Sequence, residues 1–222
     1  MESKTHTYRQ VSLSVRYNSV LFPFDTIQFL STISKEGFLQ QQQPVGPLPP
    51  GVRIEASGIV GRKGAVSVRI DADRLIFGVN APDVETVLSE MNTLESLLKS
   101  AHSFESSSLA KFYELLAGIT IKAKKNPVEC WRSHFAEVPV LKKMSQLLER
   151  RISPFGVRLA PSGELPNQTN WFEIHIVPNV PLSTDYHDVE VVYRHSSRED
   201  VFTFAKKLDA VLSAILSIVE QG

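Results

Sequence analysis

The sequence lacks several features that whole classes of protein require. Cys130 is the one cysteine among 222 residues, which excludes an intramolecular disulfide and any metal cluster built from several cysteines. No charge of one sign is in excess, because 24 basic residues balance 24 acidic ones. A neutral chain has no global field that attracts nucleic acid or an anionic membrane, so any such attraction has to be local.

Targeting and membrane segments are missing too. The stretch from Met1 to Gln10 is polar and has no apolar centre of the kind that signal peptides carry, and no apolar run approaches the roughly 20 residues that span a bilayer. A single cysteine suits a reducing compartment. We therefore expect a cytoplasmic protein without a membrane segment.

Catalytic signatures are equally scarce. The chain holds no Gly-x-Ser-x-Gly, no His-Glu-x-x-His and no dinucleotide fingerprint. The stretch Gly58–Gly64 is superficially like a phosphate loop, but it lacks the final Lys-Ser or Lys-Thr, and no helical pattern follows. We interpret it as a hairpin turn, expect no cofactor and no catalytic residue, and favour a protein without enzymatic activity.

What the chain does contain is a repeated order of amphipathic segments. Strict alternation of apolar and polar residues predicts strands, and apolar residues at three- and four-residue spacing predict helices. The expected strands cover 11–17, 52–57, 66–70, 75–79, 115–122, 157–160, 171–176 and 189–193. The expected helices carry the apolar positions of 27–33, 84–98, a proline-started segment after 127, a second segment after Pro139, and one long segment over 201–219.

Two stretches of similar sequence mark the repeat. Gly51–Gly58 and Gly156–Gly163 both begin Gly-Val-Arg and end Ser-Gly, 105 positions apart, and the surrounding elements recur at offsets of 104 to 106. We interpret the chain as α+β, a tandem duplication of a β-α-β-β-β-α unit with antiparallel sheets and helices packed on one face. The predicted units are 1–102 and 111–222, joined by a Ser-rich connection over 103–110.

The element order resembles that of the TATA-box-binding-protein-like and helix-grip folds, which also set helices on one face of a curved antiparallel sheet. The resemblance is one of topology alone, and no motif residue carries it. It therefore implies an arrangement of layers and transfers nothing about DNA binding.

With the apolar positions directed inward, the opposite sheet face collects basic side chains. We predict that a partner binds there, through Arg16, Arg53, Arg69, Lys122, Arg158, His175 and Arg194. Arg74 lies on the same face, with Glu55, Glu173 and Glu190 opposing. The duplication makes three matched pairs: Arg16 with Lys122, Arg53 with Arg158, and Arg69 with His175.

Two interpretations of this face remain open. Arginine forks suit phosphate and carboxylate groups, which points to an anionic or protein partner. Cross-strand ion pairs on a solvated face explain the same residues without any partner. Nucleic acid ranks lower, because stacking needs aromatic residues among the basic ones and only Trp171 qualifies.

Two groups of side chains deserve separate tests. Cys130 and His134 are four apart on an expected helix, so a thiol–imidazole pair is geometrically possible, although a packed core cysteine is the commoner outcome. Metal binding by the histidines of the last hairpin requires that they converge, whereas alternation directs His175 outward and His195 inward. The residues of that group are His175, His187 and His195 with Asp185 and Asp188.

The sequence thus predicts a binding protein that uses the Arg-rich sheet face or the cleft between the units. The alternative is a small-ligand-binding protein or enzyme whose pocket lies between sheet and helices. An enclosed cavity lined by Tyr17, Tyr193 and His195 would favour that alternative. Strand edges permit a homodimer without specifying one.

Overall fold

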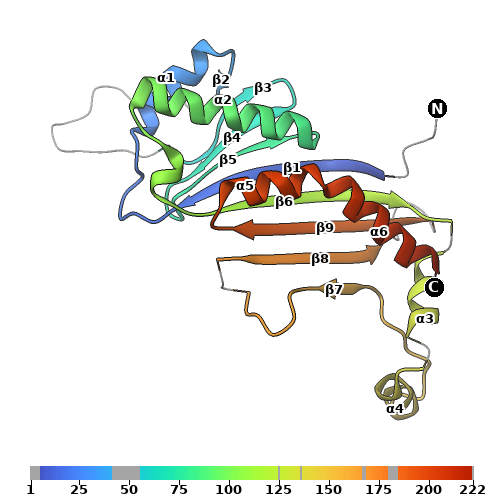
Figure 1. Ribbon diagram of the computed structural model, residues 1–222. Helices are drawn as coiled ribbons and strands as arrows, with labels where there is room; N and C mark the ends of the chain where they lie inside the picture. The colour runs from blue at the N-terminus through green and yellow to red at the C-terminus, as the bar shows by residue number, and fades with distance from the viewer. Residues whose placement is uncertain are drawn as a thin grey trace.

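The computed structural model describes residues 6–41, 56–124, 126–135, 137–166, 169–179 and 185–221. All its strands belong to one antiparallel sheet of nine strands in the order β2-β3-β4-β5-β1-β6-β9-β8-β7, shown in Figure 1. The strands are β1 (His6–Tyr17), β2 (Leu39–Gln40), β3 (Gly58–Lys63), β4 (Val66–Asp71), β5 (Ile76–Ala81), β6 (Ala110–Lys122), β7 (Val157–Leu159), β8 (Trp171–Pro178) and β9 (Tyr186–His195). The expected α+β class with an antiparallel sheet is confirmed.

Six α-helices occur in the described part of the chain. They are α1 (Thr26–Lys35), α2 (Val84–His102), α3 (Pro127–His134), α4 (Pro139–Leu147), α5 (Arg198–Lys206) and α6 (Leu208–Gln221), with a short 3-10 turn at Ser106–Ser108. Side-chain caps fix three of the starts, because Asp25, Asp83 and Ser197 each accept a hydrogen bond from the backbone N–H three residues later. None of the described helices is long and apolar enough to cross a membrane.

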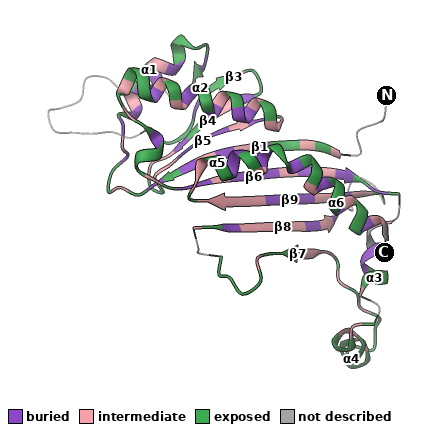
Figure 2. Cartoon of the chain, viewed as in Figure 1, coloured by how far each residue is buried: buried purple, intermediate pink, exposed green. Residues whose placement is uncertain are grey.

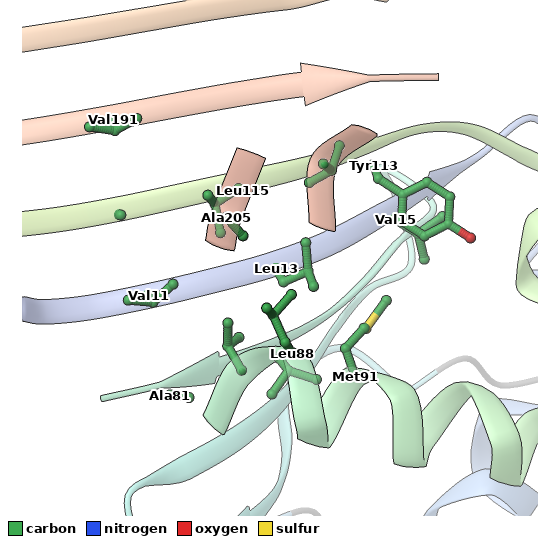
Figure 3. Packing of buried hydrophobic residues seen from close by; sticks show 14 of the residues in the cluster. Val11, Leu13, Val15, Ala81, Leu88, Met91, Tyr113, Leu115, Val191 and Ala205 are labelled. Carbon is green, nitrogen blue, oxygen red and sulfur yellow. The ribbon is translucent and has the colours of Figure 1, made fainter. Parts of the chain in front are cut away.

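The helices cover one face of the sheet. Helix α2 packs on β5 and β1, while α5 packs on β6 and β9. Figure 3 shows the layer between them, where Leu13 and Leu115 from the two central strands meet Leu88 of α2 and Ala205 of α5. Buried residues from both halves of the chain form one continuous core. The opposite face, which we call the open face, carries the intervening side chains of the same strands.

The strand order is the same outward from each central strand. Beside β1 lie β5, β4 and β3, and beside β6 lie β9, β8 and β7. In each half, therefore, the first strand is central and the last strand of that half lies next to it. The central pair joins the halves through a long antiparallel register in which Leu13 opposes Leu115.

Three local expectations are wrong. The stretch Gly58–Gly64 is not a hairpin turn, because Gly58–Lys63 forms β3 and the turn to β4 begins at Gly64. The last helix is not continuous over 201–219 but divides at Lys207, whose backbone (φ −94°, ψ 0°) is not helical. Both parts stay amphipathic, so the division keeps Ala205 and Leu208 buried on the sheet. Leu75 is not in a strand either, because it ends the β4–β5 turn with φ 56°.

Other expectations lie partly or wholly outside the described residues. The strand over 52–57 and the proline-rich stretch before it fall mainly there. The predicted connection over 103–110 contains the 3-10 turn, and β6 begins at Ala110, its last residue. The division into the units 1–102 and 111–222 remains a prediction.

Candidate functional site

The open face is read most easily as rows of side chains that oppose each other across neighbouring strands. One row crosses the whole sheet from β4 to β8. It contains Arg69, Gly78, Ser14, Glu114, Arg194 and Trp171 in that order. Two of the predicted partner-binding residues, Arg69 and Arg194, therefore lie in one row. The residues with the smallest side chains in this row are Gly78 and Ser14, next to Arg69.

The cations of the second half of this face are paired with carboxylates. Arg194 donates from Nε (2.9 Å) and Nη2 (2.6 Å) to Oε2 of Glu114, and its side chain is only 22% exposed. Arg158 donates from Nη2 to Oε2 of Glu173 at 2.6 Å. These two residues fit the cross-strand ion pairs of a solvated face.

Lys122 and His175 have other neighbours on this face, and Trp171 is covered. Lys122 Nζ lies 5.8 Å from the ring centre of Tyr186. His175 lies in register between Arg158 and Glu190. Trp171 is only 8% exposed. Its ring is therefore not available as the stacking platform that single-stranded nucleic acid needs.

The first half of the face is different. Arg69 and Arg74 both approach one carboxylate, Asp71, at the long distances of 3.7 and 3.9 Å, and their side chains are 57% and 73% exposed. Arg16, also exposed, lies 5.9 Å from the ring centre of Phe112, in register beside Ile76 and one row from Ser14. Two predicted cations thus share one carboxylate, and Ile76 separates the third, Arg16, from Asp71 in the register.

A hollow of about 250 Å³ lies beside Arg69 and Arg74. Its floor is formed where Gly78 lies between Ser14 and Arg69, and Asn80 and Ser12 continue it along the strands. A Cβ added at Gly78 would come within 2.8 Å of Ser14 Cβ and 3.0 Å of the Leu13 carbonyl oxygen. The hollow therefore depends on glycine at this position.

Sequence reasoning found Arg16, Arg69 and Arg74 but missed Gly78 and Asp71. A signal for Gly78 was present. It lies inside the predicted strand, between Phe77 and Val79, and glycine inside a strand often marks a close approach of two backbones. No signal in the sequence assigns Asp71 to two arginines at once.

Arg53 lies outside the described residues, so its pairing with Arg158 remains a prediction. The register adds one observation to it. Arg158 of β7 opposes His175 of β8, whereas the residue of β3 that opposes Arg69 of β4 is Ile59. When Arg69 is matched with His175, the strand order therefore places Ile59, not Arg53, in the position of Arg158.

The cleft between the halves lies on the helix side, between α2 and α5. Two adjoining hollows there, of about 600 and 820 Å³, share Asn92 in their lining. Six acidic and three basic residues line them: Asp83, Glu85, Glu95, Glu105, Glu199 and Asp209 against Lys99, Arg198 and Lys206. This cleft is acidic, in contrast to the Arg-rich open face.

One carboxyl in the cleft has a perturbed pKa. Burial raises the pKa of Glu95, while Arg198 Nε, 2.8 Å from Glu95 Oε2, acts in the opposite direction. The hydroxyl of Tyr113 donates to Glu95 Oε1 at 3.2 Å, and burial next to this carboxyl raises the pKa of Tyr113. Glu95 therefore serves chiefly to join α2 to β6 and α5.

The three side chains proposed to line an enclosed cavity do not surround one. The Tyr17 hydroxyl lies 3.1 Å from Ser106 Oγ, inside an aromatic cluster. The ring of Tyr193 stacks on Phe204 with 4.0 Å between centroids. His195 Nδ1 lies 3.2 Å from Asp200 Oδ2 at the start of α5. Each takes part in packing or capping at a different point.

The proposed reactive groups differ in exposure and in the side of the sheet on which they lie. Cys130 is buried at 1% exposure, while exposed His134 places Nε2 2.7 Å from the carbonyl oxygen of Ile218. His175 lies on the open face and His195 on the helix side, as expected. No group of three metal-ligating side chains occurs among the residues that the structure describes.

No protein-family model matches the chain, and no curated protein matches its sequence. The functional argument accordingly depends on the geometry alone.

Proposed function

We propose that this chain is a cytoplasmic, non-enzymatic binding protein whose open sheet face holds a protein partner through an acidic side chain. The carboxylate of the partner occupies the hollow above Gly78, between Arg69 and Arg74. The observation that carries the proposal is the hollow itself, floored by Gly78 and bordered by arginines that share Asp71.

The charge balance at the hollow favours an anion. Two guanidinium groups, those of Arg69 and Arg74, lie beside Asp71, and the remaining carboxylate of the lining, Glu114, is already bound by Arg194. A partner carboxylate would accept charge-assisted hydrogen bonds from Arg69 and Arg74, which both lie only loosely against Asp71. The hydroxyl of Ser14 and the amide of Asn80 supply further donors on the floor.

The size of the hollow favours a side chain over a free small molecule. Pockets for small ligands typically enclose roughly 300 to 1,000 Å³. The hollow offers about 250 Å³ and opens onto the sheet, where Leu116 is 43% exposed. An acidic residue carried by a larger surface fills such a site and covers the apolar neighbour, as the polar and apolar parts of a protein interface do.

A second candidate function uses the acidic cleft between α2 and α5. Its hollows, at about 600 and 820 Å³, lie within the range of ligand pockets, and the Glu95–Arg198–Tyr113 cluster forms part of the lining. Such a site would select a ligand with a cationic group. It ranks second, because Glu95 and Arg198, the charged members of that cluster, are bound to each other.

We also propose that the two halves descend from one duplicated β-α-β-β-β-α unit. The identical outward order of strands from β1 and from β6 supports this, as does the placement of α2 and α5 on the strands of their own halves. The likeness to TATA-box-binding-protein-like and helix-grip folds is part of the same proposal. It concerns architecture and carries no ligand.

The test is an amide-shift titration of the ¹⁵N-labelled protein with a short glutamate-rich peptide, and separately with inorganic phosphate. We expect peptide-dependent shifts at Ser14, Gly78 and Asn80, and their loss in the double variant Arg69→Glu/Arg74→Glu. Both side chains are more than half exposed, so the fold should tolerate the change.

The matched control is Lys35→Glu/Arg132→Glu, which makes the same change in net charge at exposed positions on α1 and α3. It should keep the shifts. Equal loss in both variants would reduce the effect to overall charge, and the absence of shifts with either anion would leave the acidic cleft as the candidate site. Phosphate binding without peptide binding would make the ligand a small anion.

A further inference from the structure

Helix α4 stands apart from the rest of the fold. Figure 1 shows it beyond β7 and away from the sheet, and Figure 2 shows its surface as exposed. None of its residues is buried. The same holds for the whole stretch 137–166, thirty consecutive residues without a buried one. Within this stretch Val157 of β7 packs against the core, whereas no residue of α4 does.

The exposed segment is nevertheless rich in apolar side chains. Seven of the fourteen large apolar residues that are exposed in the described chain lie between 140 and 165. On α4, Val140, Met144, Leu147 and Leu148 are 58%, 43%, 73% and 59% exposed. Their spacing of four, seven and eight residues places them on one side of the helix, which we call the α4 stripe. Lys142 and Gln146 lie on the opposite side.

We infer that the α4 stripe is the interface of a homodimer, in which the helices α4 of two copies pack antiparallel across a two-fold axis near Met144. In this arrangement Val140 of one copy meets Leu148 of the other, and the two Met144 side chains meet each other. Such an interface is self-complementary, as two-fold symmetry requires.

Charge favours a second copy in this orientation. Glu137 precedes α4, where its 88% exposed side chain forms an ion pair with Lys142 at 2.6 Å, and Arg150 and Arg151 follow the helix. An antiparallel pair sets Glu137 of one copy beside the two arginines of the other, at both ends of the interface. A parallel pair would place each charged residue beside the equivalent residue of the other copy, and contact between like charges is unfavourable. The ends of α4 therefore specify the antiparallel pair.

The exposed apolar surface is not confined to α4. Exposed apolar residues beyond α4, such as Phe155 at 56% and Leu159 at 40%, extend the apolar surface toward the sheet edge at β7. Contiguous apolar surface of this kind marks an interaction site in a monomer.

The first measurement is mass in solution against concentration, by sedimentation. The wild-type chain should reach twice its 24.8 kDa, and Leu147→Lys should raise the dimer dissociation constant at least tenfold. Gln146→Lys adds the same charge to the opposite side of α4 and should leave the constant unchanged. Leu147 is 73% exposed, so the variant monomer should keep its thermal transition at dilute concentration.

The second measurement locates the axis. Met144→Cys should form a disulfide-linked dimer under mild oxidation, because bridging requires Cα atoms within about 7 Å, which occurs only next to the two-fold axis. Lys142→Cys, on the far side of the helix, should not, and the wild type with its buried Cys130 gives the baseline.

Three outcomes would overturn the inference. The first is a wild-type monomer at every attainable concentration. The second is a dimer that Leu147→Lys leaves intact and Met144→Cys does not cross-link. The third is a monomeric wild type that binds phosphatidylserine vesicles, together with a Leu147→Lys variant that does not bind them. This result would make the α4 stripe a membrane-surface helix instead. None of these outcomes depends on the anion site.

Discussion

The two halves of the open face carry similar basic residues, but these residues form different ion pairs in the two halves. In the second half Arg194 and Arg158 each make a close ion pair, with Glu114 and Glu173. In the first half Arg69 and Arg74 share Asp71 at longer range. Basic residues at like positions thus give a neutralised surface on one side and a candidate anion site on the other.

The cross-strand neighbour explains the difference. Ser14 of β1 has Gly78 on one side and Glu114 on the other, and the next residues outward are Arg69 and Arg194. Where glutamate is the neighbour, the arginine folds onto it. Where glycine is the neighbour, the arginine borders a hollow. The function of an exposed arginine is therefore decided by a residue on the adjacent strand.

The strongest test of this comparison exchanges a glycine in each half. Gly78→Ala should destabilise the protein by about 1 to 3 kcal/mol, because the new methyl group meets Ser14 and the Leu13 carbonyl within 3.0 Å. It should also abolish binding of the glutamate-rich peptide. Gly118→Ala, in the second half, should cost less than about 1 kcal/mol, since its methyl group would only reach ordinary contact with Arg9 at 3.6 Å.

Urea denaturation and the peptide titration measure both effects. If the two variants lose the same stability, the close packing at Gly78 is not special to the first half. If Gly78→Ala folds and still binds the peptide, the hollow is not the site.

A second difference lies in the core beneath the sheet. His187 of β9 is buried, and neither of its ring nitrogens has a hydrogen-bond partner among the described residues. Burial lowers the pKa of His187 to about 4 from its usual 6.5. Between these pH values the unfolded state binds more protons than the folded state, so stability falls as pH falls from 6.5 toward 4, by on the order of 3 kcal/mol.

Comparison with His187→Leu isolates this contribution from the carboxyl groups that also titrate in acid. The variant should lose less stability than the wild type between pH 7 and 4.5 in urea denaturation, and it should be at least as stable at pH 7, because leucine leaves no buried polar atom unpaired. An equal loss in both proteins would mean that His187 is solvated or paired.

The smallest expected effect comes from removing the charge of Asp71 or of Glu114, the two carboxylates beside the hollow. Asp71→Asn removes the one negative charge between Arg69 and Arg74, which should tighten peptide binding about threefold at low salt, the Coulomb energy of one charge at about 6 Å in water. Glu114→Gln should leave peptide binding nearly unchanged, because Arg194 is withdrawn over the ring of Phe112 at 4.5 Å.

Titration calorimetry of the two variants at two salt concentrations provides the measurement. The gain in Asp71→Asn should disappear in high salt, where exposed charges are screened. Tighter binding in Glu114→Gln instead would place the anion in the second half of the face.

Much of the architecture could be read from the residues. Alternation around Val11–Tyr17 and the capping serine at Ser197 predicted elements that the structure contains. Local signals were insufficient where two elements had to be joined. Nothing near Lys207 announces a break, because it has neither proline nor glycine beside it, and only the sheet beneath determines where α5 ends and α6 begins.

For the site, the sequence identified the arginines but not their partners. Which face Arg69 and Arg194 occupy follows from the two-residue period of a strand, which any chain of this pattern obeys. Which carboxylate each arginine meets depends on the register between strands far apart in the chain, as with Glu114 and Arg194, eighty residues apart. Register is set by the packing of the whole core and leaves no mark on either strand alone.

The sequence by itself determined the class of fold, the amphipathic faces and the absence of disulfides, because each follows from composition or from a period of a few residues. Tertiary structure alone decided that the cleft between the halves is acidic, that Gly78 opens a hollow among arginines and that α4 is left uncovered. Those properties depend on which distant residues become neighbours, and only the folded chain brings them together.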